Sequence, residues 1–228
     1  MCFNFFSFSM IKQHILVTVD NIIFTITEDS LQILLIKRLI EPFKGEWALP
    51  GWFVLEDETL QEAAYRELEE ETSVKNAYLE QLYTFSEVKR DPRGRTISCA
   101  YMAMISRENM TIKAWSDASE VKFFDIKKLP KLAFDHKKIV NYAIQRLKWK
   151  MEYTNVAQYI LPKKFTLRQL QDVYETVLDQ AIDVRNFRKK IDKLDVVKPT
   201  WEKEIGVQYR PAKLYTFIDK QLKIVEIL

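Results

Sequence analysis

The sequence predicts an α+β fold in which a sheet lies between helices and a smaller basic module follows. The first observation is a set of β-branched, alternating runs that indicate strands, at residues 14–27, 31–38, 78–88, 96–105 and 121–125. The second is helical periodicity over residues 59–72 and 135–148. The third is a pair of helical patterns beyond residue 165, followed by two β-prone stretches. Strands and helices mixed in this way favour a layered α/β/α sandwich.

The chain divides into two parts near residue 152. Residues 161–164 (LPKK) separate the last helix of the sandwich from the next helical pattern, and they indicate a linker. We therefore expect one domain over residues 1–152 and a second over residues 153–228. Within the first domain, residues 78–105 predict a β-hairpin. Its connection at 89–95 (KRDPRGR) contains the proline and glycine typical of a turn.

The positive charge of the chain is concentrated near its C-terminal end. The 228 residues have a net charge of +3, with 47% hydrophobic and 29% charged residues, which is usual for soluble globular proteins. Residues 151–228 hold 14 Lys and Arg against 11 Asp and Glu, whereas residues 1–150 hold 21 of each. Residues 185–213 alone hold nine basic and four acidic residues. A basic patch on a neutral body favours a polyanionic partner.

Cysteine usage and apolar runs indicate the cellular setting. Cys2 and Cys99 are the only cysteines and lack metal-site spacing, which favours a reducing compartment. No run approaches the roughly 20 apolar residues of a membrane span, and residues 1–10 lack the features of a signal peptide. We expect a cytoplasmic protein with no membrane partner. Either Met1 or Met10 can be the true start of the chain.

The helix predicted over residues 59–72 carries an unusual arrangement of carboxylates. Glu67, Glu70 and Glu71 fall within one arc of about 100°, on the side that also carries Leu60, Ala63 and Ala64. Carboxylates crowded beside a core repel one another, and a hard cation such as Mg²⁺ relieves that repulsion. We therefore identify these three glutamates as candidate metal ligands, with Arg66 in reach of Glu70 at i,i+4. The alternative is a charged surface helix with Glu–Arg pairs.

Residues 51–74 (GWFVLEDETLQEAAYRELEEETSV) resemble the Nudix box, G-x5-E-x7-R-E-U-x-E-E-x-G-U, in which U is a bulky aliphatic residue. The matching positions are Glu58, Arg66, Glu67, Leu68, Glu70, Glu71 and Val74. The resemblance implies a Nudix α/β/α sandwich over roughly the first 150 residues. It also implies that the glutamates hold metal ions that bridge a diphosphate and activate water, with Glu70 and Glu71 as catalytic residues in an active enzyme. Trp52 and Ser73 replace the two glycines, so we expect ligand binding with slow or absent hydrolysis.

Four arginines are candidates for binding the phosphates of a ligand. Arg38 ends the strand before the box, Arg66 belongs to the box, and Arg93 and Arg95 lie in the hairpin connection. For the loop arginines the alternative is an ordinary solvated charge. For His136 we favour a helix-start cap or a hydrogen-bonded histidine over a catalytic role.

The C-terminal module has the order helix, tight turn, helix, hairpin, which is that of a winged helix-turn-helix domain. Thr166 and Gln169 fit a capping box for the first helix, and Asp183 fits the N-cap of the second. The second helix has an apolar stripe, formed by Val184, Phe187, Ile191 and Leu194. Its other faces are basic and suit the major groove of DNA. The candidate DNA-binding residues are Arg185, Asn186, Arg188, Lys189 and Lys190 of this helix and Arg210 and Lys213 of the wing. The alternative is a solvated face that keeps a small domain soluble.

Several segments resemble the NrtR family of Nudix-related transcriptional regulators. They are residues 90–95 (RDPRGR), 165–175, 184–190 (VRNFRKK) and 210–215 (RPAKLY), so the resemblance spans nearly the whole chain. It implies a Nudix-like ligand-sensing domain joined to a winged helix-turn-helix domain, in a homodimer that binds a double-stranded DNA operator. It also implies a small phosphate-containing effector, either ADP-ribose, another NAD-related nucleotide or a sugar metabolite.

Three functions stay open at this point. The first, which we favour, is a transcriptional regulator, more often a repressor, whose operator affinity changes when the effector binds. The second is a Mg²⁺-dependent hydrolase of the ADP-ribose pyrophosphatase type, with a basic tail for dimerisation or nonspecific nucleic-acid contact. The third is a bifunctional protein that destroys its own effector.

Overall fold

The structure is a computed structural model that describes residues 14–27, 30–75, 77–109, 118–208 and 210–227. Cys2 and the two alternative starts at Met1 and Met10 lie outside the described residues. Among the helices of the described segments, none combines the length and the apolar character that crossing a bilayer requires.

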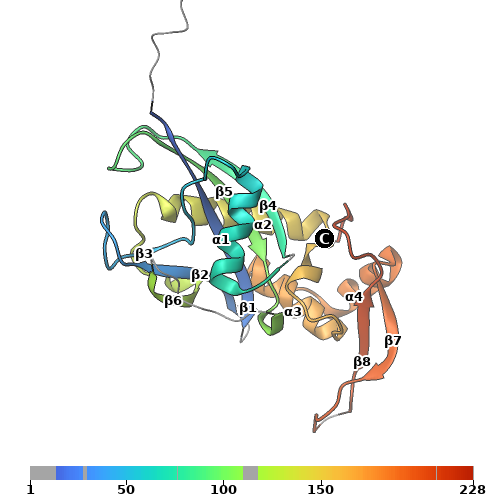
Figure 1. Cartoon of the computed structure of the whole chain (residues 1–228). Coiled ribbons are helices and arrows are strands. Elements are labelled where there is room, and N and C mark those ends of the chain that lie inside the picture. The colour runs from blue at the N-terminus through green and yellow to red at the C-terminus, as the bar shows by residue number, and fades with distance from the viewer. Residues whose placement is uncertain (1–13, 28–29, 76, 110–117, 209, 228) are drawn as a thin grey trace, which may run out of the picture.

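A six-stranded mixed sheet forms the centre of the N-terminal domain (Figure 1). Its strands are β1 (Leu16–Thr27), β2 (Ser30–Arg38), β3 (Trp47–Ala48), β4 (Tyr78–Phe85), β5 (Thr96–Met104) and β6 (Ala118–Asp125). The order is β3-β2-β1-β5-β4, with β6 paired to β2. Strand β1 runs parallel to β5 from Leu16 to Phe24 and turns back into β2 as an antiparallel hairpin. The hairpin predicted over residues 78–105 is confirmed as the antiparallel pair β4–β5.

The two long helices cover opposite faces of this sheet, which confirms the predicted α/β/α sandwich. Helix α1 (Leu60–Thr72) packs on Val19 and Ile23 of β1, because alternate residues of a strand point to the same face. Helix α2 (His136–Tyr153) packs on Ile22 and Phe24 from the other face.

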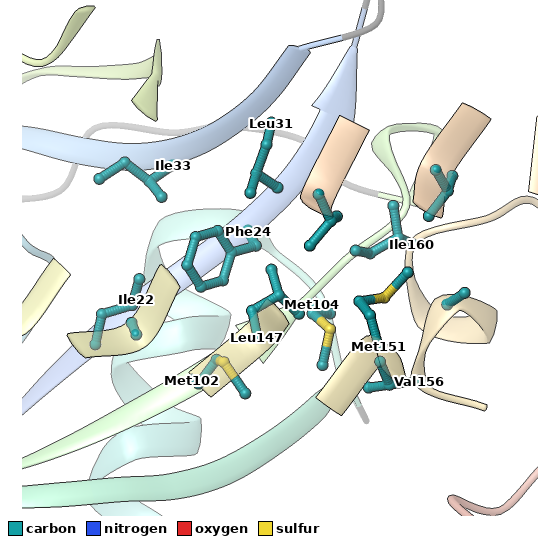
Figure 2. Close-up of a cluster of buried hydrophobic side chains, with 14 of the residues drawn as sticks. Ile22, Phe24, Leu31, Ile33, Met102, Met104, Leu147, Met151, Val156 and Ile160 are labelled. Atoms are coloured by element: carbon teal, nitrogen blue, oxygen red, sulfur yellow. The ribbon is translucent and has the colours of Figure 1, made fainter. Parts of the chain in front are cut away.

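Helix α2 extends five residues beyond the predicted end at Lys148, to Tyr153. The additional turn buries Met151 fully, and a 3₁₀-helix, η4 (Val156–Tyr159), follows at once. The segment between α2 and the expected linker at residues 161–164 is therefore partly helical, whereas residues 161–164 themselves are not helical. Burial of Val156 and Ile160 next to Met151 holds this segment in place, and Figure 2 shows these residues beside the sheet residues of the same cluster.

The C-terminal domain has the predicted winged helix architecture. It contains α3 (Leu167–Leu178), α4 (Val184–Leu194), β7 (Val197–Lys203) and β8 (Lys213–Phe217). Thr166 and Gln169 form the predicted capping box, and the Asp183 side chain accepts a hydrogen bond from the Asn186 backbone N–H at 2.8 Å. The turn between the helices begins at Asp179, which adopts the left-handed conformation that ends many helices.

The two domains share one continuous hydrophobic cluster. It runs from Phe24 of the sheet through Leu147 of α2 to Phe165, Tyr174 and Phe187 of the winged helix. A 2.6 Å ion pair between Lys127, in the 3₁₀-helix η3 (Ile126–Lys128), and Asp179 also joins them. The expected domain boundary between residues 152 and 153 falls at the end of α2, inside this shared core, and it stays a prediction.

Candidate functional site

The loop before α1 is fixed by a close approach to β1. A Cβ atom added to Gly51 would lie 2.1 Å from the carbonyl oxygen of Val19, so only glycine fits this position. On either side of it, the Asn21 N–H donates to the Pro50 carbonyl at 2.7 Å and the Val19 N–H donates to the Trp52 carbonyl at 3.0 Å. Trp52, which stands where the Nudix box has glycine, is therefore accommodated through its backbone.

Helix α1 begins and ends as its sequence requires. Thr59 and Glu62 form a full capping box at the N-terminus. At the C-terminus, Ser73 takes a left-handed conformation with φ 57° and ψ 19° and donates its backbone N–H to the Glu69 carbonyl. The turn expected at the second box glycine is thus formed by a serine, without a shift of the helix end.

The carboxylates of α1 divide between core and solvent as the helical spacing predicts. Glu67 and Glu71 are buried, with 6% and 3% exposure, and Glu70 is half-buried. Glu62 and Glu69 are exposed. Buried carboxylates are rare unless they are paired or bind a cation, so this face of α1 is chemically suited to a hard metal ion.

Arg66 organises these carboxylates chiefly through Glu58, eight residues earlier. Its guanidinium contacts Glu58 at 2.7 and 3.0 Å and also pairs with Glu67, whereas Glu70 lies 3.9 Å away. The hydrogen bonds from Arg66 hold the pKa of Glu58 below its usual value. The same contact raises the pKa of Arg66.

Among the described residues, the carboxylates of α1 do not form a ready-made metal cage. Within the part of the chain that the structure describes, no three acidic, histidine or cysteine side chains converge closely enough to hold a metal ion. The donor set of α1 fits Mg²⁺ in chemistry, since all its ligand atoms are carboxylate oxygens. Binding would need Glu67 to share its oxygens between Arg66 and the metal.

Two of the four candidate ligand arginines, Arg38 and Arg93, meet in one pocket. This arginine pocket is lined by Thr18, Asp20, Arg38, Leu49, Gly51, Trp52, Phe53, Arg90, Asp91, Arg93, Phe134 and His136. The Arg93 guanidinium carbon lies 4.8 Å from the Phe53 ring centre and 5.4 Å from that of Phe134. The Arg38 guanidinium lies 4.9 Å from the Phe134 ring. Planar cations beside aromatic rings form a surface that suits an anionic ligand with a flat base.

Asp91 holds Arg93 in this position. Its carboxylate accepts hydrogen bonds from Arg93 at 2.7 and 3.0 Å, and a third from the Arg93 backbone N–H at 2.9 Å. Burial opposes ionisation of Asp91, but these bonds lower its pKa. Arg66 and Arg95 lie elsewhere: Arg66 is bound to the glutamates, and Arg95 is half-exposed and donates to the Ser86 carbonyl at 2.7 Å.

A buried charge network lies beside the arginine pocket and was not predicted. Arg90 donates to Asp135 at 2.7 and 3.1 Å and lies 3.4 Å from Asp20, which also accepts a hydrogen bond from the Ser98 hydroxyl. Arg90 and Asp20 are both almost fully buried. Their partners come from β1, β5 and the start of α2, so only the tertiary fold brings them together.

His136 is a hydrogen-bonded core histidine, as we favoured. Its Nδ1 accepts the backbone N–H of Leu49 at 2.8 Å, and its Nε2 lies 3.5 Å from Asp20. Burial lowers its pKa. The neutral ring therefore ties α2 to the loop that leads into the Nudix box.

The candidate DNA-binding side chains lie on the outside of the winged helix domain. Phe187 and Ile191 of α4 are buried and Leu194 is half-buried, but Val184 is exposed, so the apolar stripe is one residue shorter than predicted. Among the predicted contacts, all are exposed except Lys190, which is half-buried: Arg185, Asn186, Arg188, Lys189, Lys190, Arg210 and Lys213. In the described residues none of these cations forms an ion pair with an acidic side chain.

Two family models match the chain, one in each domain. The NUDIX domain model matches residues 17–143, and the NrtR DNA-binding winged helix domain model matches residues 157–217. A solved structure with the same architecture is that of Shewanella oneidensis NrtR complexed with a 27mer DNA. It superimposes with a TM-score of 0.79 and 36% identity, over 88% of this chain and 93% of that chain.

Two curated relatives represent different activities. The chain is 38% identical over 206 residues to the ADPR responsive transcriptional repressor NtrR of Acinetobacter baylyi, which covers 89% of this chain and 82% of the relative. It is 46% identical over 138 residues to the ADP-ribose pyrophosphatase of Methanocaldococcus jannaschii, which covers 60% of this chain and 76% of the relative. The second match is confined to a shorter part of the chain.

Proposed function

Because the chain belongs to the NrtR family of Nudix-related transcriptional regulators, we propose that it is a repressor whose operator affinity is set by ADP-ribose or a related phosphate-containing metabolite. The observation that carries this proposal is the exposed basic surface of α4 and the wing, attached to a Nudix domain with a pocket lined by Arg38 and Arg93. A DNA-binding regulator of this kind acts in the cytoplasm.

DNA contact would divide between base edges and phosphates. Arg185, Asn186 and Arg188 lie in the N-terminal half of α4, where a recognition helix enters the major groove. Lys189 and Lys190 follow and suit phosphates, since lysine acts as a compact point charge. Arg210 and Lys213 extend the basic surface along the wing, and two copies in a homodimer would bind two half-sites.

The effector would occupy the arginine pocket. Arg38 is buried and already donates to the Pro42 carbonyl, and Arg93 is held by Asp91. Their remaining donors would bind a diphosphate, and the Phe134 ring beside them would pack against a flat base. The Thr18 hydroxyl lines the pocket, is buried and has no hydrogen-bond partner among the described residues, so it is available to a ligand hydroxyl or phosphate. We place Arg66 and Arg95 outside the main contacts with the ligand, because Arg66 is bound to Glu58 and Glu67 and Arg95 donates to the Ser86 carbonyl.

Mg²⁺ would bind to Glu67, Glu70 and Glu71 of α1. When bound, it would neutralise the diphosphate and acidify a water molecule. Arg66, which is held by Glu58, would position Glu67 and Glu70 for this role.

Coupling between effector and DNA requires two conformations that bind the effector with different affinity. The continuous core between the Nudix and winged helix domains, together with the Lys127–Asp179 ion pair, makes their relative position sensitive to packing in either one. Effector binding at the arginine pocket would then alter the orientation of the two winged helices within a dimer.

Fluorescence anisotropy with labelled duplexes that tile the region upstream of the gene tests DNA binding. Arg188→Ala should weaken binding to the tightest duplex about tenfold, the range for one specific side-chain contact. Arg107→Ala removes an exposed arginine of the Nudix domain and serves as the matched control, with unchanged affinity expected. Equal affinities of the wild type and Arg188→Ala would contradict the proposed interface.

Hydrolysis of ADP-ribose is a second candidate function, favoured by the intact glutamates of α1 and by the identity to the Methanocaldococcus jannaschii pyrophosphatase. Incubation with ADP-ribose and Mg²⁺, followed by chromatographic detection of AMP, tests it. Turnover that is lost in Glu70→Gln and retained in Glu69→Gln, an exposed neighbour on the same helix, would establish a bifunctional protein. If the wild type forms no AMP, ligand sensing is the sole role of the Nudix domain.

A further inference from the structure

The wing of the C-terminal domain carries an irregular stretch in β7. The register passes from Pro199 paired with Tyr215 to Lys203 paired with Lys213, so four steps along β7 match two steps along β8. Such a bulge re-aims the side chains that it contains. In Figure 1 this hairpin projects away from the body of the molecule.

Several contacts hold the bulge in one shape. The Thr200 hydroxyl donates to the Leu214 carbonyl at 3.0 Å and accepts the Glu202 N–H at 3.2 Å. Glu202 also forms an ion pair with Lys164, which lies just before α3. The Glu204 N–H donates to the Ala212 carbonyl at 3.0 Å. These contacts therefore fix the conformation of the bulge within the folded wing.

The residue that this bulge presents is Trp201, whose side chain is fully exposed at 104%. Tryptophan is rarely left in water, because full burial of a large aromatic side chain stabilises a protein by several kcal/mol, roughly 2–5. Trp201 contributes nothing to the core. A side chain of this size, held out by a fixed bulge, points to a contact made outside the chain.

The charge around Trp201 indicates what that contact is. Lys198, Lys203, Arg210 and Lys213 of the same hairpin are exposed, and no acidic partner is present for them among the described residues. Of the acidic residues near it, Glu202 pairs with Lys164, and the Glu204 carboxylate accepts the Ala212 N–H at 3.1 Å. Protein interfaces are depleted of lysine around their aromatic centres, whereas minor-groove surfaces combine cations with an apolar wedge.

We propose that Trp201 enters the minor groove of bound duplex DNA and packs its indole against a base step, which it opens, while the neighbouring cations bind the phosphates on either side. This inference rests on the proposed DNA-binding function. To the charged contacts of α4 and the wing it adds a contact with DNA that is made by an aromatic ring and lies outside α4. Opening of a base step bends the duplex and makes the affinity depend on how easily that step deforms.

Anisotropy titrations with the tightest upstream duplex compare the wild type with Trp201→Ala and Trp201→Phe. We expect about a tenfold loss for Trp201→Ala, the size of one base–aromatic contact, and a smaller loss for Trp201→Phe. The slope of log Kd against log salt should stay unchanged in both, since no phosphate contact is removed. Lys213→Ala should reduce that slope. Trp149→Ala, on α2 of the Nudix domain, is the matched control for loss of an exposed tryptophan.

A 2-aminopurine substituted at successive positions of the duplex reports the opened step directly, because its fluorescence rises when stacking is lost. We expect a rise at one position with the wild type and none with Trp201→Ala. If the wild type binds DNA but Trp201→Ala binds equally well and no position brightens, the wedge is refuted and the DNA-binding function stands. If the wild type does not bind any duplex, the proposed function itself fails.

Discussion

Removal of the buried guanidinium of Arg90 is the sharpest available test of how the arginine pocket is supported. The Arg90 side chain is 3% exposed and lies between Asp135, at 2.7 Å, and Asp20, at 3.4 Å. Burial opposes its charge, but the hydrogen bonds to Asp135 and the charge of Asp20 raise its pKa. Arg90→Met keeps most of the side-chain volume and leaves two carboxylates without their cation.

The expected loss in the free energy of unfolding at pH 7.5 is about 3–5 kcal/mol, the usual result of removing one partner from a buried ion pair. Arg95→Met, in the same hairpin connection, removes a half-exposed arginine and should cost no more than about 0.5 kcal/mol. Arg90→Lys keeps the charge without the two-pronged geometry, and an intermediate loss is expected.

Urea denaturation followed by circular dichroism measures these free energies, and a double-mutant cycle identifies their origin. Asp135→Asn removes one of the two carboxylates, so it should recover about 1–3 kcal/mol when it is combined with Arg90→Met. Strictly additive losses, or a loss below about 1 kcal/mol for Arg90→Met alone, would refute the description of this network as a buried, mutually dependent set of charges.

Three further outcomes are expected from the same structure. Gly51→Ala should lower the free energy of unfolding, measured by urea denaturation, by about 3 kcal/mol because its Cβ meets the Val19 carbonyl. Gly94→Ala, which has a similar φ but open space around it, should lower it by about 1 kcal/mol. Equal losses in the two variants would contradict the clash at Gly51. Burial lowers the pKa of His136 in the folded state, so the unfolded chain takes up a proton first and stability should fall as pH drops below about 6.5. In thermal melts, His136→Gln should flatten this fall of stability with pH. An unchanged dependence of stability on pH would contradict the role given to His136. Tyr174→Phe should leave stability unchanged or raise it by about 1 kcal/mol, since the buried hydroxyl has no hydrogen-bond partner in the described structure; a loss above about 1 kcal/mol would indicate a partner.

The sandwich and the winged helix could be predicted because local signals and burial agree along most of the chain. The capping box predicted at Thr166 is formed, and the proline and glycine of residues 89–95 lie between β4 and β5 as expected. The end of α2 could not be predicted, because no local signal stops the helix at Lys148 and burial of Met151 extends it.

The candidate site could be predicted only in part, for a physical reason. Helical spacing places Glu67 and Glu71 against the core, and the structure confirms that burial. Arg38 and Arg93 meet because β2 and the hairpin connection pack together, which no spacing in the sequence reveals. The ion pair of Arg90 with Asp20 spans 70 residues and depends entirely on the parallel pairing of β1 with β5.

Release of operator DNA by ADP-ribose tests the central proposal most directly. A labelled upstream duplex bound to the wild-type protein is titrated with ADP-ribose, with NAD and ribose 5-phosphate in parallel, and the anisotropy is followed. We expect ADP-ribose to lower the DNA affinity at least tenfold, about 1.4 kcal/mol of coupling, and Arg38→Ala to abolish that response while DNA binding persists. An unchanged affinity for DNA at concentrations where calorimetry shows that ADP-ribose is bound would contradict it.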